Sequence, residues 1–217
     1  MKPSTRTLWG LTSAATLVAA LAPAALASGH AETLVAFDPE AGQLSEGVAV
    51  APDGDVYASL SPIGQLVRIS DATGDPEVVG TVEGLVEGDF GLIGLAVGPD
   101  GAVYGGVISS VPELTGVWRF DPDAGDATRV PGTEGISFAN EPAFDDAGTM
   151  YVSDTTGGAV WRVPAGEVTT IATVDDGLDG RTSVALGPAG TDYIANFSVA
   201  LGTPLGAGPG IVAIEVE

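Results

Sequence analysis

The chain has little of the chemistry from which most catalytic and metal centres are built. It contains no cysteine and one histidine, His30, which is close to its start. These absences exclude a cysteine nucleophile and cysteine-bound zinc, and they leave a Ser-His-Asp triad without a well-placed base. Because the chain has 29 acidic residues, carboxylate and amide oxygens are the groups from which a reactive or metal-binding centre would be made.

Two such residues, Glu46 and Asn140, occupy the same place in an internal repeat. Each precedes a short apolar segment, and a glycine turn and a tyrosine follow that segment. The four copies are spaced by 47, 47 and 42 residues, as measured at Gly54, Gly101, Gly148 and Gly190. The tyrosines with the same spacing are Tyr57, Tyr104, Tyr151 and Tyr193. A fixed period of about 40–50 residues, built from short strands and glycine turns, is typical of β-propeller blades.

Each copy of the repeat has the pattern of a four-stranded antiparallel meander. The first strand is short and apolar, and the second follows the glycine turn. The third alternates apolar residues around an arginine, as in residues 65–69 and 116–120. A turn rich in glycine and aspartate leads to the fourth strand. The sequence therefore predicts an all-β fold, a β-propeller with four recognisable four-stranded blades.

The two ends of the repeat array are complementary. The fourth copy stops at its third strand, while a spare strand, residues 32–37, precedes the first copy. Pairing of these two ends would remove an exposed sheet edge. We therefore expect the N-terminal strand to close the last blade.

In a propeller, the residue before each innermost strand faces the central channel. In the four copies these residues are Glu46, Ile93, Asn140 and Thr182. The Glu46 carboxylate and the Asn140 amide oxygen are hard ligands of the kind that Ca²⁺ prefers, so we predict a metal site that contains both. Calcium takes about six to eight ligands, however, and two are few. The alternative is that Glu46 caps a turn and Asn140 holds its own loop through a side-chain-to-backbone hydrogen bond.

Two segments, residues 45–54 and residues 139–154, have the most recognisable blade motifs. Both resemble the senescence-marker-protein, gluconolactonase and luciferin-regenerating family and the related NHL-type propellers, and the resemblance covers most of the chain after residue 27. In that family a divalent cation at the channel is held by a Glu before the first inner strand, an Asn before a later one and an Asp before another. Glu46 matches the first ligand, and Asn140 matches the second.

The resemblance implies a lactonase-like hydrolase, in which the cation polarises a lactone carbonyl and an acidic group acts as general base. Where the family has its third ligand, this chain has Thr182 and Ser183. Asp154 and Asp192 are close in sequence but do not occupy the equivalent position, and Asp154 is the candidate catalytic residue.

The resemblance also implies six blades, whereas four are recognised here. The natural place for the two missing blades is between Val163 and Val168, where one copy of the repeat passes abruptly into the tail of another. Propellers of four blades also exist, so closure of the four is the alternative.

The first 27 residues have the features of a secretory signal peptide. Lys2 and Arg6 precede an apolar run from Leu8 to Leu26, and a small-x-small cleavage site ends at Ala27. A membrane anchor is the alternative, but a proline and several polar residues interrupt the run, so cleavage is favoured. No later segment is long and apolar enough to span a bilayer. We expect residues 28–217 to form a secreted propeller domain with no membrane span after cleavage.

The composition excludes some partners and leaves different function classes open. The formal net charge of −22 repels phosphate backbones and anionic lipid, so no role with nucleic acid or at a membrane surface is expected. The leading hypothesis is a secreted, calcium-dependent hydrolase of a small lactone or ester at the central channel. The alternatives are a secreted propeller that binds a small molecule or a protein partner without catalysis, and a shortened, inactive member of the family.

Overall fold

The strands of the chain are short and follow one another closely. The computed structural model describes residues 33–164, 168–173, 181–186, 191–196 and 210–215. The strands in these residues are β1 (Ser45–Val50), β2 (Val56–Leu60), β3 (Gln65–Ile69), β4 (Pro76–Thr81), β5 (Gly91–Val97), β6 (Val103–Ile108), β7 (Gly116–Asp121), β8 (Asp126–Arg129), β9 (Ala139–Phe144), β10 (Met150–Asp154), β11 (Ala159–Val163), β12 (Thr169–Thr173), β13 (Arg181–Leu186), β14 (Thr191–Asn196) and β15 (Gly210–Glu215). Short 3-10 helices are η1 (Pro39–Ala41), η2 (Ser61–Ile63) and η3 (Thr133–Gly135). None of the helices in the described residues is long and apolar enough to cross a membrane.

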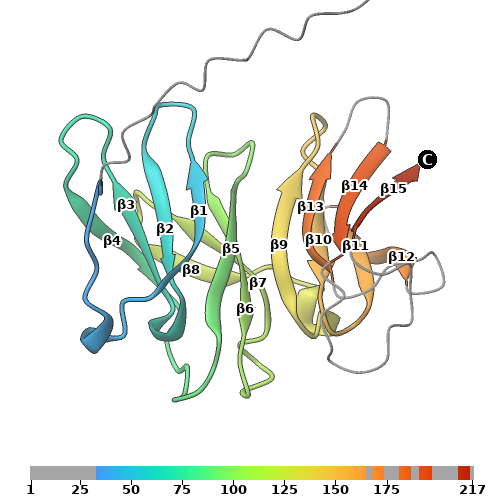
Figure 1. Cartoon of the computed structure of the whole chain (residues 1–217), viewed down its shortest axis with the longest axis horizontal. Helices are drawn as coiled ribbons and strands as arrows, with labels where there is room; N and C mark the ends of the chain where they lie inside the picture. Colours follow the sequence, from blue (N-terminus) through green and yellow to red (C-terminus); the bar gives the residue numbers. More distant parts are fainter. Residues whose placement is uncertain (1–32, 165–167, 174–180, 187–190, 197–209, 216–217) are drawn as a thin grey trace, which may run out of the picture. The chain divides into compact units, whose positions relative to one another are not determined.

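The strands form antiparallel sheets, each made of strands that are consecutive in sequence (Figure 1). The first, second and third sheets have the strand orders β1-β2-β3-β4, β5-β6-β7-β8 and β9-β10-β11-β12. The fourth sheet, β13-β14-β15, has three strands among the described residues. Each sheet coincides with one copy of the sequence repeat, and the predicted all-β propeller fold is confirmed.

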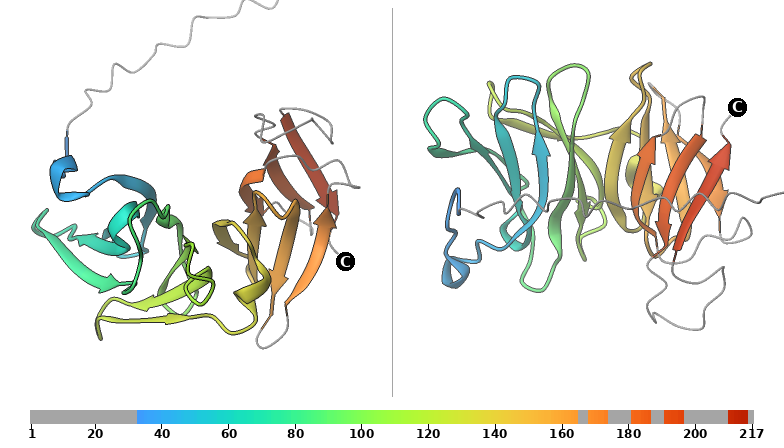
Figure 2. Two further views of the ribbon diagram at one scale, coloured as in Figure 1. Left: turned by 90° about the horizontal axis from the view of Figure 1, so that it is seen from below. Right: turned by 45° about the horizontal axis from the view of Figure 1, so that its top comes forward.

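Apolar residues between neighbouring sheets form the core. One cluster joins Leu66 of the first sheet to Phe120 of the second, and another joins Val117 of the second sheet to Val152 of the third. A further cluster contains Val184 of the fourth sheet, packed with residues of the third. The inner strands β1, β5, β9 and β13 contact one another in this order, so the sheets follow one another as blades (Figure 2).

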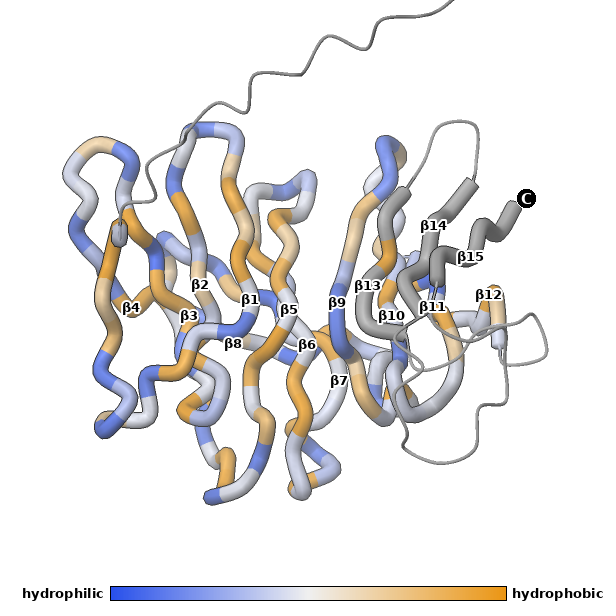
Figure 3. Tube along the Cα trace, viewed as in Figure 1, coloured by the Kyte–Doolittle hydropathy of each residue, from blue (hydrophilic) through white to orange (hydrophobic). Residues whose placement is uncertain are grey.

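Polar turns separate the apolar strands, as the colouring of Figure 3 shows at the turn between β1 and β2. The equivalent turn between β5 and β6 closes with a hydrogen bond of 3.0 Å from the Gly101 N–H to the Gly98 carbonyl. Gly101 has φ +78°, a conformation that glycine adopts without strain. The glycine whose spacing revealed the repeat is therefore required by the geometry of the turn.

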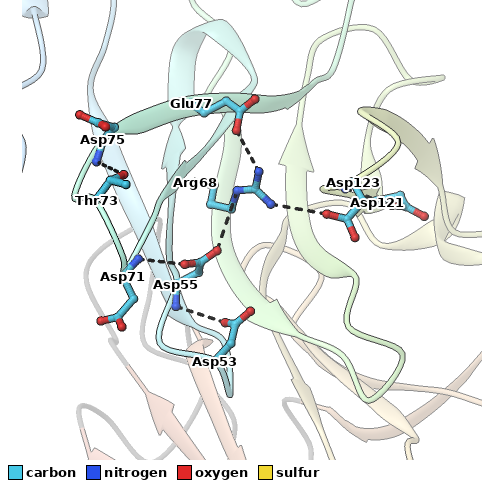
Figure 4. A network of polar contacts seen from close by, with 9 residues as sticks. All are labelled: Asp53, Asp55, Arg68, Asp71, Thr73, Asp75, Glu77, Asp121 and Asp123. Carbon is cyan, nitrogen blue, oxygen red and sulfur yellow. Dashed lines mark hydrogen bonds and ion pairs between the residues drawn. The ribbon is translucent and has the colours of Figure 1, made fainter.

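Arg68 on β3 connects acidic residues of different segments (Figure 4). Its guanidinium pairs with Glu77 on β4 at 2.9 Å, with Asp123 in the turn between β7 and β8 at 3.5 Å, and with Asp55 before β2 at 3.9 Å. Asp55 also accepts the backbone N–H of Asp71 at 2.9 Å. Exposed ion pairs contribute about 0–1 kcal/mol each, so this network adds modestly to the packing between the first and second sheets.

The segment before β1 does not have the role that was predicted for it. Residues 33–37 form no strand, and the apolar side chains of Val35 and Phe37 pack against Leu60 and Ile69 of the first sheet. The expectation that this segment closes the last blade is thereby corrected. The reason is chain entropy: the first sheet is adjacent in sequence, so burial there requires only a short loop closure.

The place where two blades were expected to be missing lies within a single sheet. Strands β11 and β12, on either side of it, pair in antiparallel register, with Arg162 opposite Thr169. Strand β12 is therefore the fourth strand of the third blade itself, and that blade has its full set of strands.

Candidate functional site

Each inner strand contains a β-bulge at its beginning. The register of the first pair of strands is interrupted between Ser45 and Val48 in β1, and the same interruption recurs in β5, β9 and β13. The residues within these bulges are Glu46 and Gly47, Ile93 and Gly94, Asn140 and Glu141, and Thr182. Bulges change the direction of side chains and are common next to functional sites. Here they fall on the four positions that were identified by aligning the copies of the repeat with one another.

Serine hydroxyls on the second strands support two of the bulges. Ser59 Oγ accepts the Gly47 N–H at 2.7 Å, and Ser153 Oγ accepts the Glu141 N–H at 3.2 Å. Both serines are fully buried. A bulge leaves a backbone donor without a partner in the sheet, and these hydroxyls satisfy it at the strands that hold Glu46 and Asn140.

Glycines bring the inner strands unusually close. A Cβ atom on Gly47 would lie 2.6 Å from the Ile93 carbonyl oxygen, and one on Gly94 would lie 2.5 Å from the Asn140 carbonyl oxygen. In both cases the obstacle is backbone, which no side-chain rotation can move away. The glycines therefore set the short distance between the strands that surround the site.

The bulges of β1, β5 and β9 surround one cavity of about 340 Å³. Its lining residues are Glu46, Gly47, Val48, Gly94, Leu95, Asn140 and Glu141. The structure thus brings together Glu46 and Asn140, as predicted from their equivalent places in the repeat. Ile93, at the corresponding position of β5, is buried and does not line the cavity.

Glu141 also lines the cavity, and sequence reasoning missed it. The signal was present, because Glu141 aligns with Gly47 and Gly94, the glycines that follow the selected positions in the first two copies. The first two copies have a glycine at this place and the third has a glutamate. Packing does not require this change, so it indicates a functional role for the side chain.

The cavity is electrostatically unfavourable for a second negative charge. Burial raises the pKa of Glu46 above its usual value, and the nearby Glu141 carboxylate raises the same pKa further. The charged form of Glu46 is therefore disfavoured, and a bound cation would offset both effects. Asn140 donates from Nδ2 to Thr155 Oγ1 at 3.0 Å, which fixes the orientation of its amide group.

Asp154, the candidate catalytic residue, has a different environment. It is 1% exposed and is not among the residues that line the cavity. Its carboxylate accepts the N–H groups of Ser137 at 3.1 Å, Phe138 at 3.0 Å and Gly157 at 2.8 Å, and the Trp161 indole N–H at 3.3 Å. These bonds connect the turn after β10 to the segment that leads into β9. That segment ends at Phe138, two residues before Asn140.

The donor atoms at the cavity fit a hard cation. Glu46 and Glu141 supply carboxylate oxygens and Asn140 an amide oxygen, the ligand types of calcium. Three acidic or histidine residues grouped around one point are not found in the described part of the chain. Thr182 lies in the bulge of β13, and its side chain is outside what the structure describes. A cation at this place would thus have the Glu46 carboxylate and the Asn140 amide oxygen as ligands, with further oxygens such as water, and the Glu141 carboxylate nearby.

Solved structures with a similar fold identify the fold of this chain. A gluconolactonase from Xanthomonas campestris superposes with a TM-score of 0.58 and 18% identity, over 80% of this chain and 58% of that one. An inactive variant of virginiamycin B lyase from Staphylococcus aureus, solved with quinupristin, has a TM-score of 0.55 and 16% identity, over 70% of this chain and 48% of the other. The fold is that of the gluconolactonase-like β-propellers.

A streptogramin B lyase matches in the same way, with a TM-score of 0.51 and 10% identity, over 79% of this chain and 54% of that one. The chain therefore spans about half of the length of the propellers it resembles, between 48% and 58% in these three comparisons. No family model and no curated protein matches the sequence.

Proposed function

We propose that the chain is a lactonase-like propeller hydrolase whose site is the cavity between β1, β5 and β9. The observation that supports this most is the convergence of Glu46, Asn140 and Glu141 on one cavity of about 340 Å³. The likeness of the fold to a gluconolactonase supports the same reaction class. From the signal-peptide features of residues 1–27 we further propose that the protein acts outside the cytoplasm.

Glu46 and Asn140 would hold a divalent cation, which we propose to be calcium. When bound, such an ion supplies Lewis acidity to a carbonyl oxygen. Glu141 is the residue to which we assign the role of general base, accepting a proton from the attacking water. In this reaction water adds to the lactone carbonyl and the ring C–O bond breaks. The ring oxygen then leaves as a hydroxyl group.

Asp154 enters this proposal as a positioning residue. Its carboxylate accepts two N–H groups of the segment that leads into β9 and two from the turn after β10 and from β11, so it ties that segment to the rest of the sheet. Asn140 and Glu141 belong to β9. The Asp154 carboxylate would act on the site through the backbone without touching the substrate.

The test combines a binding measurement with an activity measurement. Thermal unfolding is followed after EDTA treatment, with and without added CaCl₂. Binding to the folded state alone stabilises it by about 2.7 kcal/mol when the free ligand is at 100 times its Kd. Hydrolysis of a panel of small sugar and aliphatic lactones is followed as proton release at constant pH, against buffer without protein.

Two variants and one control make the test specific. Glu46→Gln and Asn140→Ala should abolish the calcium-dependent rise in melting temperature and lower kcat/KM by roughly 100-fold or more. Glu113→Gln removes the same charge from an exposed loop residue and should change neither. Cooperative unfolding that ignores calcium, together with no lactone turnover, would exclude this function and favour a binding propeller without catalysis.

A further inference from the structure

Three apolar residues occupy the same place in successive blades, directly before an inner strand. Leu44 precedes β1, Phe90 precedes β5 and Phe138 precedes β9. Leu44 is 50% exposed, Phe90 is 61% exposed, and Phe138 is half-buried. We call these three residues the entry rim. The strands that follow them are the three that surround the cavity.

The entry rim lies at the end of the inner strands where the cavity is. The arrows of β1 and β9 point the same way in Figure 1, and the bulges that surround the cavity are at the beginnings of these strands. Leu44 is two residues before Glu46, and Phe138 is two residues before Asn140. Two residues of chain span at most about 7 Å. A molecule bound at Glu46 and Asn140 therefore has apolar side chains within its reach.

The two aromatic residues of the rim contact each other across neighbouring blades. The ring centroids of Phe90 and Phe138 are 5.5 Å apart and the ring planes are inclined by 64°, an edge-to-face arrangement. Phe90 is still 61% exposed with this contact in place, so most of its surface is open to another molecule. The pair thus forms one apolar surface that extends over the entries of β5 and β9.

The backbone of the rim is fixed by the residues that follow the second strands. The Leu44 carbonyl accepts the Ser61 N–H at 2.8 Å, and the Phe138 carbonyl accepts the Thr155 N–H at 3.1 Å. The Ser61 hydroxyl also donates to the Phe90 carbonyl. Side chains on a fixed backbone lose less freedom when they bind, so the rim is organised before a ligand arrives.

Asp89, next to Phe90, fixes the loop from the other side. Its carboxylate accepts the Ser109 hydroxyl at 2.6 Å, the Ser110 N–H at 2.8 Å and the Val86 N–H at 3.1 Å. The hydrogen bond from Ser109 is the main cause that lowers the pKa of Asp89 to about 2, so the carboxylate stays charged at neutral pH. The exposed ring of Phe90 is therefore held in place by a loop with several hydrogen bonds.

We propose that the entry rim binds an apolar substituent of the substrate, so that the site prefers lactones with an aryl or alkyl group over polyhydroxylated sugar lactones. The cavity has the polar groups, Glu46, Asn140 and Glu141, and the rim has apolar ones. A polar lactone ring with an apolar substituent matches both. Sugar hydroxyls at the rim would lose water without gaining hydrogen-bond partners. This inference rests on the proposed hydrolase function, because it assigns the reacting ring to the cavity.

The experiment compares two lactones that differ only in a phenyl group, γ-phenyl-γ-butyrolactone and γ-butyrolactone, with D-glucono-δ-lactone as the polar reference. Turnover by the full chain is followed as proton release with CaCl₂ present. The KM for the phenyl lactone should be roughly 10-fold lower than that for the unsubstituted one, with similar kcat. The sugar lactone should have the highest KM of the three.

Variants of the rim assign the preference to its side chains. Phe90→Ala and Phe138→Ala should each raise the KM for the phenyl lactone roughly 10-fold and leave that for γ-butyrolactone unchanged. Phe90→Leu should keep most of the preference, because it keeps an apolar side chain. Phe144→Leu is the matched control: Phe144 forms an edge-to-face pair with Tyr104 at 4.8 Å, at the other end of β9, and should not alter either KM.

Binding measured without turnover separates this inference from the proposed function. Saturation-transfer NMR detects contact of the protein with the phenyl protons of the same lactone. Transfer that Phe90→Ala removes, with no turnover of any lactone, would support the rim and contradict the hydrolase.

Three results would overturn the role of the rim. Turnover with equal KM for the phenyl and the unsubstituted lactone would leave the hydrolase in place without it. An equal effect of Phe144→Leu and Phe90→Ala would show that the preference is not located at the rim. A lower melting temperature of Phe90→Ala with an unchanged KM would show that the aromatic pair serves only the fold.

Discussion

Asp154 illustrates how a side chain can matter to a site without facing it. A buried carboxylate is costly unless hydrogen bonds compensate it, and here four N–H groups of the surrounding segments do so. The family resemblance made Asp154 the candidate for catalysis. In the structure two of its hydrogen bonds are to the segment that enters β9.

Replacing Asp154 by Asn should destabilise the protein strongly. The amide nitrogen would face N–H groups that the carboxylate now accepts, so we expect a loss of about 2–4 kcal/mol in the free energy of unfolding. Urea unfolding measures this loss. The control is Asp126→Asn, at an exposed position of β8, where a change within about 0.5 kcal/mol is expected.

The same variant separates positioning from catalysis. If Asp154 positions Asn140, activity per folded molecule at low temperature should fall less than it does in Glu46→Gln. Unchanged stability combined with complete loss of activity would contradict the positioning role and return Asp154 to the catalytic set.

The inner strands and their bulges are the elements on which the site depends. Opposite the bulges of the first three sheets lies a small residue: Ser59 in the first, Gly106 in the second and Ser153 in the third. A Cβ atom on Gly106 would collide with the Ala139 carbonyl oxygen. Small residues at this place thus let neighbouring blades approach each other. Where the small residue is a serine, its hydroxyl also accepts a backbone N–H of the bulge.

Gly94→Ala should separate β5 from β9 and disrupt the cavity. The added Cβ would lie 2.5 Å from the Asn140 carbonyl oxygen and 3.0 Å from the Glu141 Cα, so backbone must move, at a cost of about 1–3 kcal/mol. Thermal unfolding measures this cost, and calcium binding reports on the cavity. Gly135→Ala is the control, because nothing lies within 4 Å of its added Cβ. Equal stability of the two variants would show that the strand spacing is not set by Gly94.

The elements also show what the sequence could and could not predict. The glycines and tyrosines of the repeat predicted the blades, because turn geometry and core packing impose the same residues in every copy. Alignment of the copies placed Glu46 and Asn140 on one cavity. It missed Glu141, since a bulge lets two adjacent residues of one strand line the site, and a bulge has no signature in strand periodicity.

The N-terminal segment could not be placed from its pattern either. An alternating apolar segment such as residues 33–37 fits any apolar surface, and the sequence does not say whether the first or the last sheet receives it. Competition between those surfaces is decided by loop closure, which favours the nearer one.

Charge acts on the molecule as a whole. With a formal charge of −22 the folded chain repels itself, while Arg68, Arg119 and Arg129 each pair with acidic residues and offset part of that repulsion. These pairs are partly exposed and therefore weak, whereas the uncompensated carboxylates are numerous. Repulsion should accordingly outweigh attraction.

Salt should therefore stabilise this protein. Raising NaCl from about 0.1 M to about 1 M shortens the screening length from about 10 Å to about 3 Å, which weakens the long-range repulsion more than the ion pairs in contact. The melting temperature should rise across this range, and sucrose at equal osmolality is the control for solute exclusion. Arg68→Gln removes the partner of Glu77, Asp55 and Asp123, so it should lower the melting temperature at low salt and have a smaller effect at high salt. A melting temperature that falls with salt would instead show that the arginine pairs outweigh the repulsion among the carboxylates.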